Sequence, residues 1–459
     1  MDATRRQFLG RGAAAAATAA AMAGAARPAI GAVPWTSSAR PDGIGSNGAA
    51  TTGASAGSLL ASSVPPGLPG RDYRPVVTPN GAALPFKIVE GVKVFHLVPI
   101  VVAHEFAPGL SGESWGYNGR VHGPTIEAVE GDRVRIYVTN KLPVATTVHW
   151  HGVEVPSGMD GVGGLSQRPI EPGETFKYEF TFPRPGTFMY HSHHDEMTQM
   201  ALGLMGMIVV HPRKAEAAPP DRDYVYLLSE WNVKVGTLRP DPNEMTDFNV
   251  LTLNAKVYPA ADAIVAKLGE RVRIRFGNLS AMDHHPMHLH GLRFAVTATD
   301  GGDVPETARF QETTVLVPVG TTRTIEFIAD NPGDWALHCH MTHHVMTQMG
   351  HGVPNLIGLH VTDFDEAVAR AIPAFRDAVQ DRIGDDPEVA AAGDIPPNSL
   401  PMMGGVGPQG FITMGGMFTV LKVREKLDGA GDPGWYEPPP GTLAAPPTPE
   451  ELARDGIVV

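Results

Sequence analysis

Two stretches of the chain alternate strictly between apolar and polar residues, which is the pattern of a β-strand with one buried face. Residues 133–139 alternate valine and isoleucine with arginine and tyrosine, between a Gly131-Asp132 turn and Asn140. Residues 271–276 repeat this design with valine, isoleucine and phenylalanine against three arginines. Short runs of this kind, bounded by glycine, proline and asparagine, predict an all-β protein.

The repetition extends to longer segments that recur in the same order. The matched pairs are His149-Trp150-His151-Gly152 with His288-Leu289-His290-Gly291, residues 185–193 with 332–340, and Met197-Thr198-Gln199-Met200 with Met346-Thr347-Gln348-Met349. The period, about 140 residues, is too long for a solenoid unit and suits a duplicated β-sandwich domain. The repeats predict one sandwich at 84–212 and a second at 222–363.

The segments outside the repeats have other patterns. Residues 32–83 are rich in serine, glycine, alanine and proline, which predicts a disordered linker. In the C-terminal extension, 364–459, apolar residues at helical spacing predict one amphipathic helix over Asp365 to Ile383. Proline- and glycine-rich segments follow it, and one of them, 400–420, is also rich in methionine.

Composition narrows the function. The chain has 459 residues, with 36 lysines and arginines against 49 acids and a net charge of −13. This acid excess argues against nucleic acid or an anionic membrane surface as partner. A single cysteine forms no internal disulfide, and if the protein is exported, metal ligation would protect the thiol.

The first 31 residues predict export. Thr4-Arg5-Arg6-Gln7-Phe8-Leu9-Gly10 precedes an alanine-rich run that ends in small-residue cleavage patterns. This pattern resembles a twin-arginine export signal. The run is too short and too rich in alanine and glycine to span a bilayer, so we expect no membrane insertion after signal removal and a periplasmic or secreted protein.

Four His-x-His pairs lie at matching places in the two repeats. They are 149/151, 191/193, 288/290 and 338/340. On a strand, this spacing places both imidazoles on one face and the residue between them on the other. Eight converging imidazoles predict a site for several metal ions, and imidazole suits copper, zinc, iron or nickel.

The second repeat adds sulfur to this pattern. Cys339 lies between two histidines, His285 lies three residues before His288, and His344 and Met349 follow. Two histidines, a thiolate and a weak thioether form the ligand set of a blue-copper electron-transfer site. The matching residue of the first repeat is Ser192, so we expect no blue-copper site there.

These four motifs resemble the signatures of multicopper oxidases, the laccase-like family. The resemblance implies two cupredoxin-like Greek-key sandwiches that hold one type 1, one type 2 and two type 3 copper ions per active unit. The implied ligands are His285, Cys339, His344 and axial Met349 for type 1, His149 and His288 for type 2, and His151, His191, His193, His290, His338 and His340 for type 3. With two repeats and no third, the chain is similar to the two-domain group, which implies a homotrimer with clusters between subunits. Copper nitrite reductases differ, since they keep the type 1 cysteine in the first domain and lack the type 3 histidines.

The resemblance also implies an activity. A small reducing substrate, phenol-like or similar, gives electrons to type 1 copper; they pass through Cys339 to His338 and His340, and O2 is reduced to water. Asp160 matches a family aspartate that relays protons, although an aspartate before a glycine also caps its own turn. The neighbouring His194, His284 and His343 are interpreted as surface or supporting residues.

The methionines leave the substrate open. Met402, Met403, Met414 and Met417 lie in the glycine-rich tail. Thioethers suit Cu(I), so the tail could deliver copper, or it could simply pack on the sandwiches. A metal oxidase acting on Cu(I) or Mn(II), and a copper-binding protein without turnover, are therefore the alternatives to a phenol oxidase.

Overall fold

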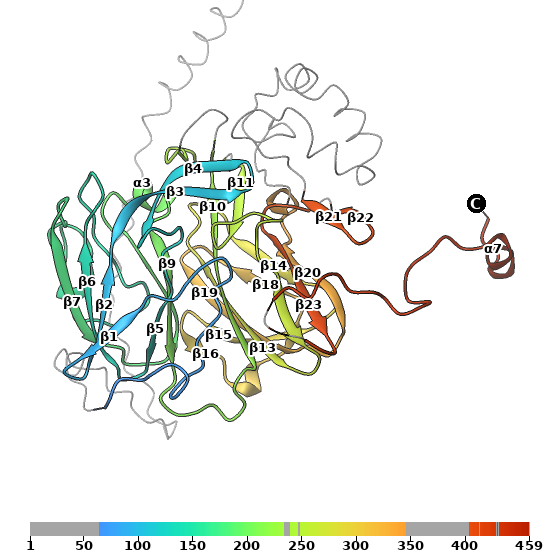
Figure 1. Ribbon diagram of the computed structural model, residues 1–459, viewed down its shortest axis with the longest axis horizontal. Coiled ribbons are helices and arrows are strands. Elements are labelled where there is room, and N and C mark those ends of the chain that lie inside the picture. Colours follow the sequence, from blue (N-terminus) through green and yellow to red (C-terminus); the bar gives the residue numbers. More distant parts are fainter. Residues whose placement is uncertain are drawn as a thin grey trace, which may run out of the picture. The chain divides into compact units, whose positions relative to one another are not determined.

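The computed structural model describes residues 64–233, 239–246, 248–345, 404–412, 414–427, 429 and 431–458. Strands dominate these residues and form two β-sandwiches, coloured blue to green and yellow to red in Figure 1. The all-β prediction is confirmed. The predicted export signal and the predicted helix at 365–383 lie outside the described residues. Among the described residues, no helix is long and apolar enough to cross a membrane.

The first sandwich has a four-stranded sheet in the order β1-β2-β6-β7, a three-stranded sheet in the order β5-β9-β8, and a hairpin of β3 and β4. The bounds are β1 (Phe86–Val89), β2 (Val92–Leu97), β3 (Pro99–Ala107), β4 (Leu110–Tyr117), β5 (Ile126–Val129), β6 (Arg133–Thr139), η1 (Ser157–Met159), β7 (Thr175–Thr181), β8 (Gly186–His191), α3 (Glu196–Ala201) and β9 (Met205–His211). Along β6, buried and half-buried residues alternate as the sequence predicts.

The second sandwich has one sheet in the order β11-β10-β13-β19-β15-β16, with β17 beside β15, and another in the order β12-β23-β20-β14-β18. The bounds are β10 (Arg222–Trp231), β11 (Val250–Leu253), β12 (Ile264–Lys267), β13 (Arg271–Asn278), β14 (His285–Leu289), β15 (Phe294–Thr299), β16 (Gly302–Asp303), η2 (Glu306–Ala308), β17 (Gln311–Glu312), β18 (Thr314–Val317), β19 (Thr321–Ile328), β20 (Gly333–Cys339), η3 (Thr342–Val345), β21 (Gly405–Gly407), β22 (Gly410–Ile412), β23 (Phe418–Arg424) and α7 (Pro449–Asp455).

The two sandwiches share a pairing pattern. β5 is parallel to β9 and β9 is antiparallel to β8, just as β12 is parallel to β23 and β23 is antiparallel to β20. His149 bridges His191 as His288 opposes His338. The repeat in the sequence is therefore a repeat in the sheets, and the residues of β8 and β9 have counterparts in β20 and β23.

The arginines of β13 depart from simple alternation. Arg273 and Arg275 are buried, although they face away from the core of their own sandwich. Arg275 forms two hydrogen bonds of 2.8 Å to Asp223 and a third to Thr187 of the first sandwich. The second sandwich uses this face as a contact with the first, and paired charges make the burial tolerable.

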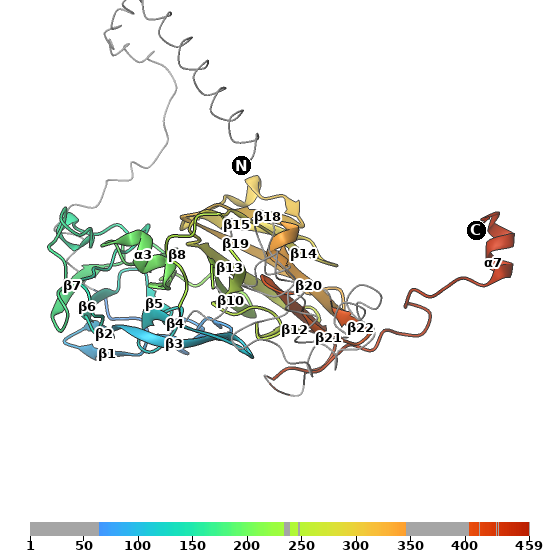
Figure 2. The same ribbon diagram turned by 90° about the horizontal axis from the view of Figure 1, so that it is seen from above.

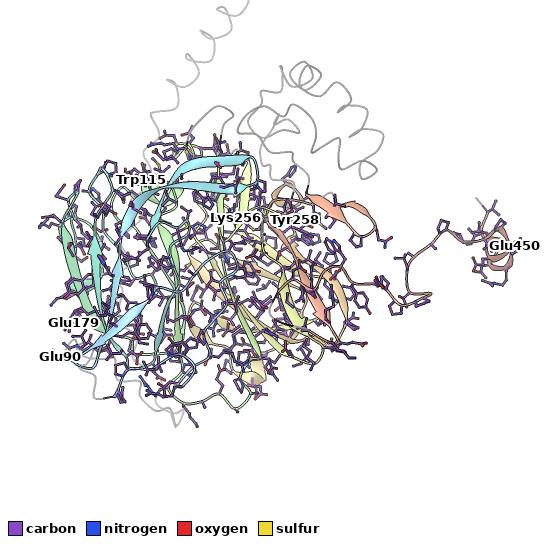
Figure 3. The ribbon with its side chains drawn as sticks, in the orientation of Figure 1. Glu90, Trp115, Glu179, Lys256, Tyr258 and Glu450 are labelled. Atoms are coloured by element: carbon purple, nitrogen blue, oxygen red, sulfur yellow. The ribbon has the colours of Figure 1, made fainter. Side chains whose placement is uncertain are left out.

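The last strand of the second sandwich comes from beyond its predicted end at residue 363. β23, at 418–424, lies between β12 and β20 in the sheet. Figure 1 shows β23 beside β20, and Figure 2 shows β12 in the same part of the molecule as β20. The ring of Tyr258, labelled in Figure 3, packs edge-on against Phe418 with centroids 4.7 Å apart. Part of the C-terminal extension is thus integral to the second domain. β20 pairs with β14 along one edge, and β23 is its partner along the other.

Residues 64–83, predicted as part of a disordered linker, also pack on the sandwiches. The backbone N–H groups of Gly67 and Val76 donate to the carboxylates of Asp132 and Glu127. A parallel bridge joins Val77 to β10. The prediction of disorder is wrong for this part, since buried carboxylates supply partners that composition does not reveal.

Candidate functional site

Three buried side chains meet at one end of the second sandwich. His285 is the first residue of β14, Cys339 is the last of β20, and His344 lies in η3. Nδ1 of His285 is 3.1 Å from Nδ1 of His344, and the Cys339 sulfur is 3.8 and 3.3 Å from these two atoms. All three side chains are completely buried. Their ligand atoms lie close enough together to hold one metal ion.

The outer nitrogens of both imidazoles are held by neighbouring residues. Nε2 of His285 lies 2.7 Å from the Ser280 hydroxyl, and Nε2 of His344 lies 3.6 Å from an Asp283 carboxylate oxygen. Partners of this kind fix the orientation of a metal-binding ring. Both Nδ1 atoms therefore face the sulfur.

Burial keeps His285 and Cys339 uncharged in the absence of metal. It lowers the pKa of His285 to about 3, with the neighbouring His344 as a smaller cause. Burial also raises the pKa of the Cys339 thiol to about 12. The neutral His285 imidazole is ready to bind, whereas the Cys339 thiol ionises only when a metal replaces its proton. Two imidazoles and one thiolate in a dry site fit a type 1 copper ion.

Four histidines of the first sandwich form a second group. The ring of His149 lies 5.8, 5.3 and 5.4 Å, between centroids, from the rings of His151, His191 and His193. Nδ1 of His151 is 3.3 Å from Nε2 of His191. Burial lowers the pKa of His191 to about 3, which keeps its imidazole neutral.

Four histidines of the second sandwich form the matching group. The ring of His288 lies 4.7, 5.6 and 5.3 Å from those of His290, His338 and His340. Nε2 of His290 is 3.1 Å from Nε2 of His338. The Cys339 side chain lies in the core of the sandwich, on the face opposite to these rings, as strand alternation requires.

Backbone carbonyls orient corresponding rings in both groups. Nδ1 of His149 lies 2.8 Å from the Asp160 carbonyl, and Nδ1 of His288 lies 2.7 Å from the Thr313 carbonyl. His191 and His338 each bond through Nδ1 to the carbonyl of the next residue, at 2.8 and 2.7 Å. In all four rings Nε2 is left to face the group, as expected for metal ligands with supporting partners.

The two groups remain separate within the chain. Every ring contact of these eight histidines with another of them lies within one group. His288 and His290 instead line a cavity of about 790 Å³, beside Arg293, Arg309 and Asp330. His290 and His340 are exposed. Each chain thus presents two half-sets of ligands.

Asp160 contacts a predicted ligand twice. Besides the carbonyl, its carboxylate lies 3.4 Å from Nδ1 of His149. The residue follows η1 and is half-exposed. This position allows it to orient His149 and to reach solvent.

In the first sandwich, the residues that correspond to the buried triad of the second sandwich are hydrogen-bonded to one another. Thr146 lies three residues before His149, and its hydroxyl is 2.7 Å from Oε1 of Gln199 and 3.3 Å from the Ser192 hydroxyl. The Ser192 hydroxyl lies 2.5 Å from the same Gln199 oxygen. Ser192 was expected to exclude a type 1 site, whereas Thr146 and Gln199 were not identified from the sequence.

Other predicted residues have different outcomes. Nδ1 of His284 accepts a hydrogen bond from the Val319 N–H, away from the buried triad. Met349, predicted as the axial type 1 ligand, lies outside the described residues, as do Met402 and Met403. Met417 is buried in the core of the second sandwich rather than in a free tail.

The chain matches known protein families in both sandwiches. Two family models, each described as multicopper oxidase, match residues 102–215 and 234–356, together more than half of the chain. Copper resistance protein A of Pseudomonas syringae pv. tomato is 30% identical over 232 residues, covering 40% of this chain and 38% of that protein. L-ascorbate oxidase of Cucurbita pepo var. melopepo is 42% identical over 121 residues, covering 25% of this chain and 22% of that protein.

A solved structure extends the likeness to the fold. The multicopper oxidase mgLAC is 27% identical, with a TM-score of 0.53 over 75% of this chain and 88% of its own. The chain matches less than half the length of these curated relatives. The family models, the fold and the donor sets of both sandwiches agree: this chain belongs to the multicopper oxidase family.

Proposed function

We propose that this chain couples the oxidation of a small reducing substrate at a type 1 copper to the reduction of O2 to water at a trinuclear cluster. The buried triad of His285, Cys339 and His344 carries this proposal, because it supplies the two imidazoles and the thiolate that a type 1 copper needs. The first repeat has no thiol at the corresponding position. When bound, copper supplies the redox chemistry, and the protein supplies geometry, insulation and protons.

The chain itself connects the two centres. Cys339 is bonded through the backbone to His338 and His340, whose rings lie on the opposite face of β20. A sulfur ligand of one centre is therefore only a few covalent bonds from imidazole ligands of the other. Asp160, within 3.4 Å of His149 and half-exposed, is placed to pass protons from solvent.

We propose further that the trinuclear cluster forms between subunits of a homotrimer. Type 2 and type 3 copper need ligands from both groups, His149 to His193 and His288 to His340, and these groups make no ring contact with each other in one chain. Head-to-tail association in a closed ring would bring the first group of one subunit to the second group of the next. A mass measurement in solution should give three chains per particle.

Cys339→Ser tests the oxidase function. We expect loss of the blue absorption band and of O2 consumption with a phenolic donor, since a neutral hydroxyl cannot replace the thiolate. Ser192→Cys is the matched control, because it changes the corresponding residue of the first repeat; it should leave both signals at the wild-type level. O2 turnover by Cys339→Ser would contradict the proposed electron path.

A specific cavity favours Cu(I) as a second candidate donor beside phenols. It measures about 420 Å³ and includes Ser280, which contacts His285. Its walls carry five methionines, Met197, Met200, Met205, Met245 and Met282. Thioethers are ligands for Cu(I), and one named relative is a copper resistance protein. This support is independent of the methionine-rich tail.

Carboxylates complete the cavity. Glu230 lines it, and burial, with Asp283 beside it, raises the pKa of Glu230 to about 9. The Glu230 and Asp283 side chains share a hydrogen bond, and Oδ2 of Asp283 lies 3.6 Å from Nε2 of His344. A cation bound here would displace the Glu230 proton and pair with both carboxylates. Ser280 of the cavity wall contacts His285, and Asp283, the residue after Met282 of the wall, approaches His344.

An oxygen electrode with two donors tests this candidate. Replacing Met245 and Met282 together by leucine should lower kcat/KM for Cu(I) at least about tenfold, because two soft ligands are lost. Oxidation of a phenol by the same variant is the internal control and should stay unchanged. An equal loss with both donors would contradict a Cu(I) site.

We also propose export by the twin-arginine route, on the sequence at residues 4–10. Replacing Arg5 and Arg6 by lysine should retain the protein in the cytoplasm. Cell fractionation with an antibody against the folded domains measures this, and normal export of the variant would contradict it.

A further inference from the structure

Strand β23 and strand β9 occupy the same place in the two sandwiches, so the residues before them can be compared. The residue before β9 is Leu204, and the residue before β23 is Met417. The Ser192 N–H donates to the Leu204 carbonyl at 3.1 Å, and the Cys339 N–H donates to the Met417 carbonyl at the same distance. Leu204 and Met417 are therefore corresponding residues.

The backbone around them also agrees. A glycine with positive φ precedes each, Gly203 at +112° and Gly416 at +56°. The Leu204 N–H donates to the Gln199 carbonyl at 3.0 Å, and the Met417 N–H donates to the carbonyl of His344 at 3.1 Å. Gln199 is thus the counterpart of His344, and the correspondence covers a whole site rather than one residue.

The Met417 side chain faces the inside of the second sandwich. It is completely buried and belongs to the same core cluster as Cys339. The next residue, Phe418, packs in a different cluster with Tyr258, on the other side of the sheet. The side chain thus lies on the face of the sheet that carries the thiol, and its backbone bonds to two of the three type 1 ligands.

We propose that Met417 supplies the axial thioether of the type 1 copper, in place of the Met349 predicted from spacing. This inference rests on the proposed function, because it assumes a type 1 copper at His285, Cys339 and His344. The sandwich with these ligands has methionine at this position, and the sandwich without them has leucine, which is similar in size but cannot bind a metal. A weak axial thioether beside two imidazoles and a thiolate completes the type 1 set.

The proposal changes how the site is built. Three ligands come from residues 285–344, whereas the fourth comes from the residue before β23, after a long intervening segment, 346–413. The segment that begins at Met417 supplies both the axial ligand and the strand that pairs with β20. The type 1 site is then complete only when the C-terminal segment is in place.

Three variants of the copper-loaded full chain test the assignment by spectroscopy rather than by turnover. Met417→Leu, which copies the first repeat and conserves volume, should keep copper bound but shift the blue band, change the electron paramagnetic resonance signal and raise the reduction potential. Met417→Gln should lower the potential instead, because an amide oxygen favours Cu(II) more than a thioether does. Met349→Leu is the matched control and should leave all three readouts at the wild-type values.

Each result supports or overturns the assignment. Opposite shifts of the potential in the leucine and glutamine variants, with Met349→Leu unchanged, support it. Unchanged spectra in Met417→Leu, or an equal or larger shift in Met349→Leu, overturn it. A wild-type protein that binds copper without any blue band would instead refute the proposed function, so the two failures are distinguishable.

Discussion

At corresponding ends of the two sandwiches, three side chains meet in different ways. In the first sandwich, Thr146, Ser192 and Gln199 satisfy one another, with the two hydroxyls 2.7 and 2.5 Å from one amide oxygen. In the second, two imidazole nitrogens and the Cys339 sulfur converge on one point. The first arrangement is complete without any other atom, whereas the second brings together donor atoms that a metal ion satisfies.

The same place in the fold thus has a structural role in the first sandwich and a metal-binding role in the second under the proposed function. Both sandwiches keep four histidines at the end of corresponding strands, so under the proposed function both contribute to the cluster. Only the second has a buried triad that can pass electrons. In the first, a hydrogen-bonded network fills the same volume and keeps the sandwich closed without metal.

Mixing two inactive variants tests the contribution of both sandwiches to one cluster. We expect His149→Ala and His288→Ala each to abolish O2 reduction, because each removes a type 2 ligand. Co-assembled in equal amounts, they should recover about a quarter of wild-type activity, since a quarter of the interfaces in a ring would pair two intact halves.

Assembly provides the control for this experiment. The two variants should be mixed under conditions that exchange subunits and, separately, as finished particles that do not exchange. Recovery only after exchange supports a shared cluster. No recovery in exchanged particles would show that each cluster lies within a single chain.

The sequence predicted much of the fold and the site for a physical reason. The period of two in strands made the alternation visible, and pairs such as His288 and His290 lie on one face as this period requires. The repeat then located the sandwiches. Ser192 stands where the second repeat has its cysteine, so the expectation that the first repeat has no type 1 site needed only the alignment of two short motifs.

The axial residue and the last strand could not be located in the same way. The repeated sequence Met-Thr-Gln-Met aligns Gln199 with Gln348. The backbone hydrogen bonds instead show that Gln199 corresponds to His344. The two connections differ in length, because the first contains helix α3 and the second contains η3. Spacing therefore misaligns this region. The apolar run at 418–424 is too short for its partner strand to be identified from periodicity alone.

Replacing Gln199 by alanine measures how much the hydrogen-bonded triad stabilises the first sandwich. The amide oxygen accepts from two buried hydroxyls, and its nitrogen donates to the Ala145 carbonyl at 2.8 Å. Leaving these groups unpaired should lower the free energy of unfolding of the copper-free protein by about 1–3 kcal/mol. Urea denaturation measures this change.

Cys339→Ala in the same copper-free protein is the matched comparison. Loss of one sulfur from the second triad should cost about 1 kcal/mol, since only a small cavity remains. A cost for Cys339→Ala equal to that of Gln199→Ala would contradict the view that only the first triad stabilises the protein without metal.

The two triads should also differ in how the stability of the copper-free protein depends on pH. The pKa of His285 is lowered to about 3 by burial, whereas an unfolded histidine has a pKa of about 6.5. Between these values the unfolded chain binds a proton that the folded, copper-free chain does not. Stability is therefore complete above about pH 6.5 and is lost as the pH falls toward 3, by at most about 1.4 kcal/mol per pH unit for this residue.

His285→Thr, which copies Thr146 of the first repeat, removes this titration. Unfolding free energies of the copper-free variant between pH 4 and 6.5 should therefore fall less steeply with decreasing pH than those of the wild type. Thr146→Val is the control, because it removes a hydrogen bond at the corresponding position but no titrating group. It should lower stability equally at every pH in this range. An unchanged slope for His285→Thr would mean that His285 takes up its proton as readily in the folded second sandwich as in the unfolded chain, and this would contradict the lowered pKa.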